Sequence, residues 1–356
     1  MKIVLATPIY PPEIGGPAIY SQRLKEGLEK MGHEINIVSY RDLRAYPQPL
    51  RIFVYFLKLL KSAKGCDLIY SFNLTSCGLP ACCVSKILST RFFVRIGGDF
   101  LWERAVEAGR TQKPLREYYE DSKTFKERFW IRLMKKVFNQ AGRIIFTSGF
   151  QRNIYLKYFG VDEHKTVIIQ NPFPEISLPA DNAQDTKYQI LYAGRLLKLK
   201  NLDFLIRVFH NVLLKTGKKL TLKIIGEGPE SKNLKADKSI IFSPAISQQD
   251  LWKEIQQAYL CVLPSLTEIT PNFALECLKL RKPILLTKET EYFETLKDDL
   301  IFIDPQNEID LEDKIIYLLD EKNYFSYVEK IKRISTQRSW EDVIKEHEES
   351  FIHRSH

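Results

Sequence analysis

Residues 261–276, with the sequence CVLPSLTEITPNFALE, run from a short apolar stretch through a polar loop into an amphipathic segment. The apolar run 261–264 is typical of a buried strand, and the spacing of apolar residues in 272–280 predicts a helix. A strand that is apolar on both faces and leads directly into a helix belongs in a parallel sheet covered by helices. The stretch therefore predicts an α/β fold.

The same alternation continues in both directions along the chain. The first half predicts strands at 3–6, 35–39, 68–71, 92–96 and 143–147 and helices at 22–31 and 151–159. A polar stretch, 171–187, follows, which we interpret as an interdomain linker. The pattern then restarts, with strands at 190–193, 220–225, 240–242, 261–264 and 283–286 and helices at 202–215, 248–258, 272–280 and 311–319. We therefore expect two doubly wound Rossmann-like domains, residues 1–172 and 186–337, facing each other across a ligand-binding cleft.

Composition and length agree with this architecture. The chain has 356 residues, of which 44% are hydrophobic and 27% charged, and this excludes a disordered or fibrous protein. Its six cysteines form no CxxC pair, which is typical of small buried residues in a reducing cytosol. No run approaches the ~18 uncharged apolar residues that cross a bilayer. We expect a cytoplasmic protein.

The loop before the helix at 272–280 has the features of an anion site. Thr270 is a suitable N-cap and Pro271 suits the first helical position, so the amides of Asn272 and Phe273 would face an anion. Glu276, at ~1.5 Å per residue along the helix, would lie ~7–8 Å further on, a distance that suits the ribose of a bound diphosphate. Glu268, before the helix, would lie near a sugar. Spacing alone leaves open an ordinary capped helix with two solvated glutamates.

Glu268 and Glu276, separated by seven residues after a strand, resemble the E-x7-E signature of the family-4 retaining glycosyltransferases, which have the GT-B fold. Three further segments are similar to motifs of this family in order and spacing. They are Gly194-Arg195 with Lys200, the turn Gly226-Glu227-Gly228-Pro229, and the glycine pair Gly15-Gly16 near the start of the chain. The resemblance covers nearly the whole chain.

The resemblance implies transfer of a sugar from a nucleotide-diphosphate donor to a hydroxyl acceptor, a glycan or a lipid-linked sugar, as in polysaccharide biosynthesis. Arg195 and Lys200 would grip the donor diphosphate, Gly226 would lie over the nucleotide, and Gly15 and Gly16 would approach the phosphates. Fixed cations stabilise the charge that develops on a leaving diphosphate. With these groups available and no Asp-x-Asp motif in the chain, we expect neither a metal ion nor a cofactor. A last helix within 338–356 is expected to pack on the first domain.

The stretch 95–104 departs from the family pattern. Many members carry a histidine where this chain has Gly97, so Asp99 becomes the best polar candidate for catalysis and acceptor binding. Trp102 and Glu103 are further acceptor candidates, since an indole can stack on a sugar and a carboxylate can hydrogen-bond it. A core tryptophan and a solvated glutamate are the equally open alternatives.

The net charge of +9 divides unevenly between the expected domains. Residues 1–172 carry 27 Lys plus Arg against 15 Asp plus Glu, a net of +12, and the remainder carries −3. Two stretches of the first domain, 50–61 and 126–136, mix basic, aromatic and aliphatic residues as interfacial helices do. They indicate peripheral docking on the anionic inner face of a membrane; core-packed helices with cationic outer faces are the alternative. No nucleic-acid-binding module accompanies the charge, so we expect no nucleic-acid partner.

Two other functions fit the same architecture. A nucleotide-sugar epimerase would convert the donor without an acceptor. A non-catalytic subunit would keep the nucleotide-sugar site and lack the chemistry at Gly97. A panel of sugar nucleotides distinguishes the three, through epimerised sugar, released nucleoside diphosphate, or binding without turnover.

Overall fold

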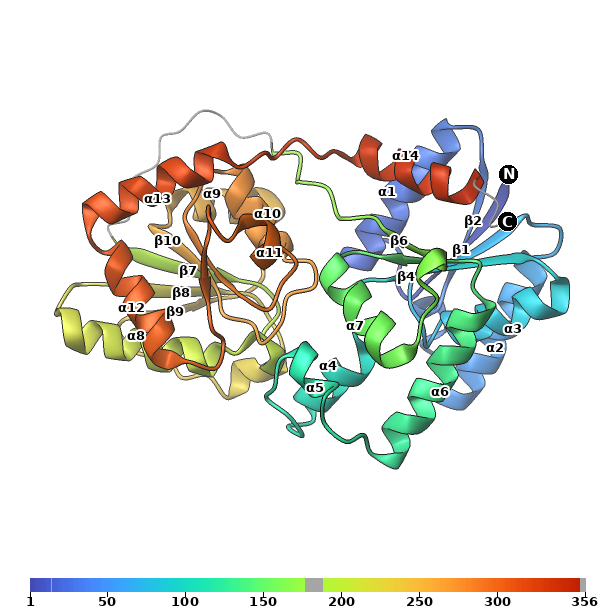
Figure 1. Ribbon diagram of the computed structural model, residues 1–356, viewed down its shortest axis with the longest axis horizontal. Coiled ribbons are helices and arrows are strands. Elements are labelled where there is room, and N and C mark those ends of the chain that lie inside the picture. The colour runs from blue at the N-terminus through green and yellow to red at the C-terminus, as the bar shows by residue number, and fades with distance from the viewer. Residues whose placement is uncertain (14, 177–187, 353–356) are drawn as a thin grey trace. The chain divides into compact units, whose positions relative to one another are not determined.

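The computed structural model describes residues 1–13, 15–176 and 188–352 (Figure 1). The chain forms two compact units. Unit 1 comprises Met1–Leu101, Asp121–Pro172 and Arg338–His356, and unit 2 comprises Trp102–Glu120 and Phe173–Gln337. Most of the expected linker, 177–187, lies outside the described residues.

Unit 1 holds six strands and the helices that cover them. The strands are β1 (Lys2–Thr7), β2 (Glu34–Ser39), β3 (Leu68–Ser71), β4 (Arg91–Ile96), β5 (Arg143–Phe146) and β6 (Thr166–Ile168). The helices are α1 (Gly16–Lys30), α2 (Gln48–Ser62), α3 (Gly78–Leu88), α6 (Phe125–Gln140), α7 (Gly149–Phe159) and α14 (Trp340–Ile352), with 3-10 turns at Arg41–Leu43 and Glu163–Lys165. Helix α4 (Phe100–Glu107) begins in unit 1 and ends in unit 2.

The sheet of unit 1 is parallel throughout, in the order β2-β1-β3-β4-β5-β6. The direction of winding reverses between β1 and β3, which pair with Leu5 opposite Tyr70. Helix α14 packs on α1, where a side chain at Gly27 would collide with Ile344. Trp340, Val343 and Phe351 thereby join the core of this unit.

Unit 2 is built on the same plan. Its strands are β7 (Gln189–Ala193), β8 (Thr221–Ile225), β9 (Ile240–Ser243), β10 (Leu260–Leu263), β11 (Ile284–Thr287) and β12 (Ile301–Ile303). Its helices are α5 (Leu115–Tyr118), α8 (Leu202–Thr216), α9 (Gln248–Gln257), α10 (Asn272–Lys279), α11 (Tyr292–Leu296), α12 (Glu308–Leu318) and α13 (Glu321–Arg333), with 3-10 turns η3 (Lys198–Lys200) and η4 (Pro229–Lys232).

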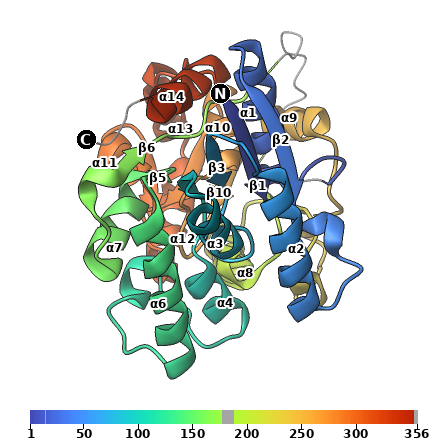
Figure 2. The same ribbon diagram turned by 90° about the vertical axis from the view of Figure 1, so that its right-hand side faces the viewer.

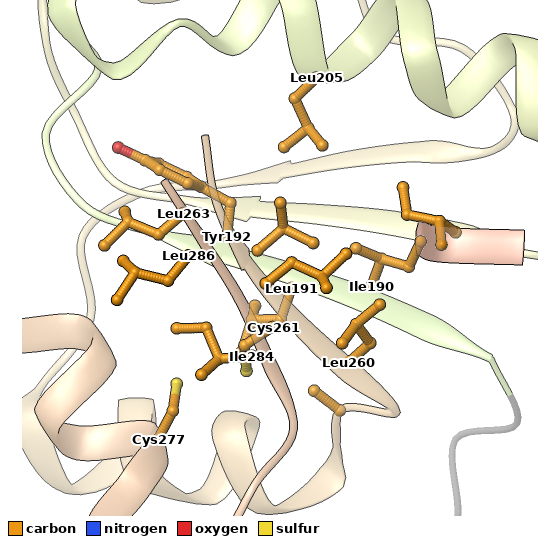
Figure 3. Close-up of a cluster of buried hydrophobic side chains, with 14 of the residues drawn as sticks. Ile190, Leu191, Tyr192, Leu205, Leu260, Cys261, Leu263, Cys277, Ile284 and Leu286 are labelled. Carbon is orange, nitrogen blue, oxygen red and sulfur yellow. The ribbon is translucent and has the colours of Figure 1, made fainter. Parts of the chain in front are cut away.

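The second sheet is also parallel, in the order β12-β11-β10-β7-β8-β9. Helices α8 and α12 pack together on one face, and α10 lies on the other (Figure 1). All four residues of β10 are buried, and Figure 3 shows Cys261 of this strand packed among Leu191 and Ile284 of its neighbours. A strand covered on both faces explains the uninterrupted apolar run from which the α/β class was predicted. That prediction is confirmed.

The structure corrects some expected boundaries. Residues 102–120, expected in the first domain, belong to unit 2. Helix α1 begins at Gly16, six residues before the expected start, because Pro17 fits the first turn of a helix. The strands β6 and β12 were not predicted; each has three residues, and pairing with the sheet edge, not apolar pattern, defines them.

Candidate functional site

Two loops lie at the point in unit 2 where the winding of the sheet reverses. Strand β7 ends at Ala193 and leads into Gly194 and Arg195, and its neighbour β10 ends at Leu263 and leads toward Glu268. In open parallel sheets, ligands bind at the carboxyl ends of the strands beside this reversal. The sheet order therefore brings together two segments that are separated by about 70 residues in sequence and were both expected to bind the donor.

An ion pair joins the two loops. The Lys200 ammonium donates to Oε1 of Glu268 at 2.5 Å, and the hydroxyl of Ser265 donates to the same oxygen at 2.5 Å. The Glu268 side chain is 8% exposed and that of Lys200 20% exposed, so solvent screens the pair weakly. Both residues were predicted from sequence to act on the donor, and the structure places them in direct contact.

Arg195 follows β7 on the same loop as Lys200, and its side chain is exposed. The Tyr192 hydroxyl donates to the backbone carbonyl of Arg195 at 3.1 Å and so holds the start of this loop. Burial raises the pKa of Tyr192 well above its usual value, with the Glu268 carboxylate adding to the rise and Arg195 opposing it. The charges of Arg195 and Glu268 therefore both act on the pKa of the Tyr192 hydroxyl.

At Gly194 and Gly226, the loop that follows β7 and the loop that follows β8 approach each other closely, backbone to backbone. The Gly194 amide donates to Ile225 at 3.0 Å and the Leu196 amide to Glu227 at 2.9 Å. A Cβ at Gly226, where φ is 144°, would stand 1.9 Å from the carbonyl oxygen of Gly194. Gly226, expected over the nucleotide, therefore also fixes the position of the Arg195 loop.

The start of α10 differs from the expectation. The helix begins at Asn272 and its N-cap is Pro271, which has no side-chain acceptor, so Thr270 is not the capping residue. The Asn272 amide donates to the Thr270 carbonyl at 3.0 Å, so it is engaged locally. Phe273 occupies the second helical position, where the α-helical pattern leaves an amide without an intrahelical acceptor. The amide of Phe273 is the better candidate for a phosphate contact.

Glu276 lies on the first turns of α10 and is half-buried. Its Oε1 accepts a hydrogen bond of 2.8 Å from the side-chain amide of Gln248, the first residue of α9. Burial raises the pKa of Glu276 to about 7, and the bond from Gln248 opposes the rise. With Oε1 engaged by Gln248, the other carboxyl oxygen is the candidate acceptor for the hydroxyls of a ribose.

The candidates of unit 1 follow the ends of its own strands. Gly15 is the N-cap of α1 and Gly16 its first residue, and a Cβ at Gly16 would meet no atom within 4 Å. Asp99 follows β4 and is fully buried; the Tyr155 hydroxyl donates to its Oδ2 at 2.8 Å. The Gln151 amide donates to the carbonyl of Gly98 at 3.0 Å, so α7 supports the Asp99 segment at two points.

The other two acceptor candidates lie in unit 2, not with Asp99. Trp102 is 2% exposed and its indole N–H donates to the Lys113 carbonyl at 2.9 Å, which is the arrangement of a core tryptophan. Glu103 is half-buried. The boundary between the two units falls inside α4. Asp99 and Trp102 therefore belong to different units, although they are close in sequence.

Models of known families match both halves of the chain. The model described as glycosyl transferases group 1 matches residues 175–337, and the model described as glycosyltransferase family 4 matches residues 14–174. The chain belongs to the family-4 glycosyltransferases. The two parallel six-stranded sheets and the solved structures that resemble this chain identify its fold as GT-B.

Similar proteins match this glycosyltransferase over nearly its full length. An uncharacterized glycosyltransferase from Methanocaldococcus jannaschii is 22% identical, over 97% of this chain and 96% of its own. Sucrose-phosphate synthase from Thermosynechococcus elongatus superposes with a TM-score of 0.74 at 16% identity, over 98% of this chain and 97% of its own. A trehalose-6-phosphate structure from E. coli bound with UDP-2-fluoro glucose has a TM-score of 0.72 at 11% identity, over 98% of each chain.

Four residues that support the glycosyltransferase site were not identified from sequence: Glu107, Gln248, Ser265 and Thr267. Ser265 and Thr267 adjoin Glu268, so proximity in sequence was an available signal. Glu107 and Gln248 are distant in sequence from the residues they contact, at Leu199 and Glu276, and no local pattern marks them.

A cavity of about 510 Å³ opens in unit 2 next to these loops. Its lining includes Val106 and Thr111, Asn201 at the N-cap of α8, and Phe204 of that helix. Arg195, Lys200, Glu268 and Glu276, all within the described residues, do not line it. The cavity is therefore distinct from the expected donor site.

Within the described ranges, no three His, Cys, Asp or Glu side chains gather in an arrangement that could hold a metal ion. Across that same part of the chain, every helix is too short or too polar to pass through a bilayer.

Proposed function

We propose that this glycosyltransferase moves a sugar from a nucleoside-diphosphate sugar, bound by unit 2, to the hydroxyl of a glycan or lipid-linked acceptor, with retention of configuration and without a metal ion. The observation that carries the proposal is the Lys200–Glu268 pair at the reversal point of the sheet, with Arg195 on the same loop as Lys200. The E. coli relative bound with UDP-2-fluoro glucose supports a nucleotide-sugar donor. Retention rests on the family resemblance.

The chemistry required of the chain is the stabilisation of negative charge. As the bond between the sugar C1 and the diphosphate oxygen breaks, both electrons leave with the diphosphate. Arg195 can fork onto two phosphate oxygens, Lys200 supplies a point charge, and the Phe273 amide adds a dipole. The Lys200 ammonium is held by Glu268 and the Phe273 amide by its helix, so the reorganisation of these two groups costs little. The preorganised cations do the work for which a metal would otherwise serve.

The carboxylates have separate roles in this proposal. Glu268 accepts hydrogen bonds from Lys200 and Ser265, and its second oxygen would accept from the hydroxyls of the donor sugar. Glu276 would accept from the ribose hydroxyls. Asp99 would act on the acceptor side, with one oxygen held by Tyr155. Glu103 would be a weaker acceptor contact, and Trp102 would support the fold.

A nucleotide panel tests the donor site. Binding of a nucleoside diphosphate at 100 times its Kd should stabilise the protein by about 2.7 kcal/mol. Uridine and guanosine diphosphates are compared on the wild type, Arg195→Ala and Glu276→Ala, followed by a turnover assay with sugar nucleotides. Loss of the shift in both variants, with release of nucleoside diphosphate by the wild type, is expected. A wild type that no nucleotide stabilises would contradict the donor site, and epimerised sugar would favour the epimerase.

A second part of the proposal concerns the membrane. Helices α2, α3 and α6 lie side by side on unit 1 (Figure 2). On α2, Ile52 and Phe53 are 46% and 57% exposed; on α6, Phe125 and Phe129 are 73% and 50% exposed. Water contact of four large apolar side chains is unfavourable in a free protein. Exposed basic residues stand among them: Lys58, Lys61, Lys126, Arg128, Arg132 and Lys136.

This α2–α6 surface fits the interfacial helix interpretation better than the core-packed one, because both helices expose apolar and basic side chains together. We expect it to dock on anionic lipids, with about 1 kcal/mol of attraction per basic residue near the surface. Vesicles of phosphatidylcholine with and without phosphatidylglycerol test it by co-sedimentation at low salt. Phe125→Ser with Phe129→Ser should weaken binding, and Leu214→Ser, which alters an 84% exposed leucine of unit 2, should not. Equal binding of all three proteins would contradict the docking surface.

A further inference from the structure

Among the described residues of 1–172, the stretch 102–120, here called the strap, packs within unit 2, and the rest belongs to unit 1. The chain enters unit 2 inside α4 and leaves it after Glu120, so the strap is tethered at both ends to unit 1. It buries apolar side chains such as Val106 and Leu115, and it also makes polar contacts with the rest of unit 2. Two of the polar contacts fall on the loops that carry Lys200 and Glu268.

The first anchor is the carboxylate of Glu107, the last residue of α4. Its two oxygens accept from the backbone amides of Lys198 and Leu199, at 3.4 and 3.2 Å. These residues begin η3, the turn that ends with Lys200. The preceding residue, Leu197, has no side-chain acceptor to cap the turn. Glu107 therefore provides, from a segment about 90 residues away, the acceptors that a local cap would otherwise supply.

The second anchor lies on the loop of Glu268. The Leu115 amide of the strap donates to the hydroxyl of Thr267 at 2.9 Å, and Thr267 is 3% exposed. The two loops are also joined directly, since the Leu266 amide donates to the Leu199 carbonyl at 2.9 Å. The hydrogen bonds thus form a closed circuit, from the strap to the η3 turn, to the Glu268 loop, and back to the strap.

We propose that Glu107 is a positioning residue for Lys200, and that the strap sets the geometry of the Lys200–Glu268 pair. A lysine side chain is flexible and carries a compact charge, so the position of its ammonium depends on how firmly its backbone is held. The circuit fixes the backbone on each side of the pair, two residues or fewer from Lys200 and one from Glu268. The proposal rests on the proposed function, since it assumes that Lys200 binds the donor diphosphate.

The experiment uses the full chain and measures uridine and guanosine diphosphate binding by calorimetry. Glu107→Ala should weaken binding by about tenfold, the equivalent of one hydrogen bond to a charged group. Glu107→Gln keeps one acceptor oxygen and should have a smaller effect. Glu117→Gln, on the same strap and half-buried like Glu107, is the matched control and should bind like the wild type. Equal effects of Glu107→Ala and Glu117→Gln would overturn the proposal.

A double-mutant cycle separates positioning from general stability. If Glu107 acts through Lys200, Glu107→Ala should change binding less than twofold once Lys200 is replaced, as in Lys200→Met. The same tenfold loss in both backgrounds would show that Glu107 acts elsewhere. Amide exchange at 198–200 should accelerate in Glu107→Ala even without nucleotide, and unchanged exchange would also overturn the proposal. Failure of the wild type to bind either nucleotide would instead refute the donor site.

Discussion

Replacement of Glu276 by glutamine should change how the stability of unit 2 depends on pH. Glu276 accepts a hydrogen bond from Gln248, and a glutamine at the same position keeps an acceptor oxygen and nearly the same volume. The substitution therefore removes the titration and leaves the packing in place. Any difference between the two proteins that varies with pH reports the carboxyl group itself.

The sign and size follow from the pKa of Glu276, which burial raises from 4.5 to about 7. A carboxyl with a higher pKa in the folded chain binds its proton more tightly when folded. Its contribution to stability is fully present below pH 4.5 and is lost as the pH rises to about 7. The shift corresponds to on the order of 3 kcal/mol as an upper bound. The stability of Glu276→Gln relative to the wild type should therefore increase between pH 4.5 and 7 and stay constant above pH 7.

Hydrogen exchange measured by mass spectrometry provides the assay, because it reports the opening free energy of unit 2 separately from that of unit 1. Peptides from β10 and α10 are followed at pH 5, 6, 7 and 8, corrected for intrinsic exchange rates. Glu294→Gln replaces an exposed carboxyl in α11 and is the control. If the free-energy difference between Glu276→Gln and the wild type is the same at all four pH values, the reasoning from burial is refuted.

Three further predictions concern single side chains. Gly226→Ala should destabilise unit 2 by about 1–3 kcal/mol more than Gly217→Ala, since both glycines have positive φ but only the first Cβ would collide with a carbonyl oxygen; equal unfolding free energies in denaturant would contradict the packing role. Burial lowers the pKa of His347 well below its usual 6.5, with the nearby arginine charges adding to the effect, so unit 1 should lose stability as the pH falls below about 6.5. In His347→Phe, the stability reported by hydrogen exchange of α14 should fall less between pH 7.5 and 5 than in the wild type. An equal fall in the two proteins would exclude this histidine as the source of the pH dependence. Asp99→Asn should lower turnover by about 100-fold or more, whereas Tyr155→Phe, which removes the same hydrogen bond but keeps the carboxylate, should lower it far less at a similar melting temperature; parallel losses in the two variants would make Asp99 structural.

The sequence predicted most of the fold because the fold is encoded in local pattern. The strands β3 and β10 are apolar on both faces, and such runs, separated by amphipathic stretches, are required by a parallel sheet between helices. The edge strands β6 and β12 were not predicted, because a strand of three residues is too short to show an apolar pattern. The start of α10 at Asn272 was predicted, but its N-cap was placed one residue early, at Thr270, because the choice between Thr270 and Pro271 depends on backbone angles that composition does not fix.

The sequence by itself supplied the candidate side chains of the donor site. Glu268 and Glu276 were placed from their spacing around a helix start, and Arg195 and Lys200 from the family resemblance, since charge and hydrogen-bonding capacity are properties of the residues themselves. Only the tertiary structure decided how these residues meet. The sheet order sets the loops of β7 and β10 side by side, and this contact creates the Lys200–Glu268 ion pair. The assignment of residues 102–120 to unit 2, with Glu107 on the η3 turn, likewise depends on contacts between segments far apart in the chain, for which spacing along the sequence carries no information.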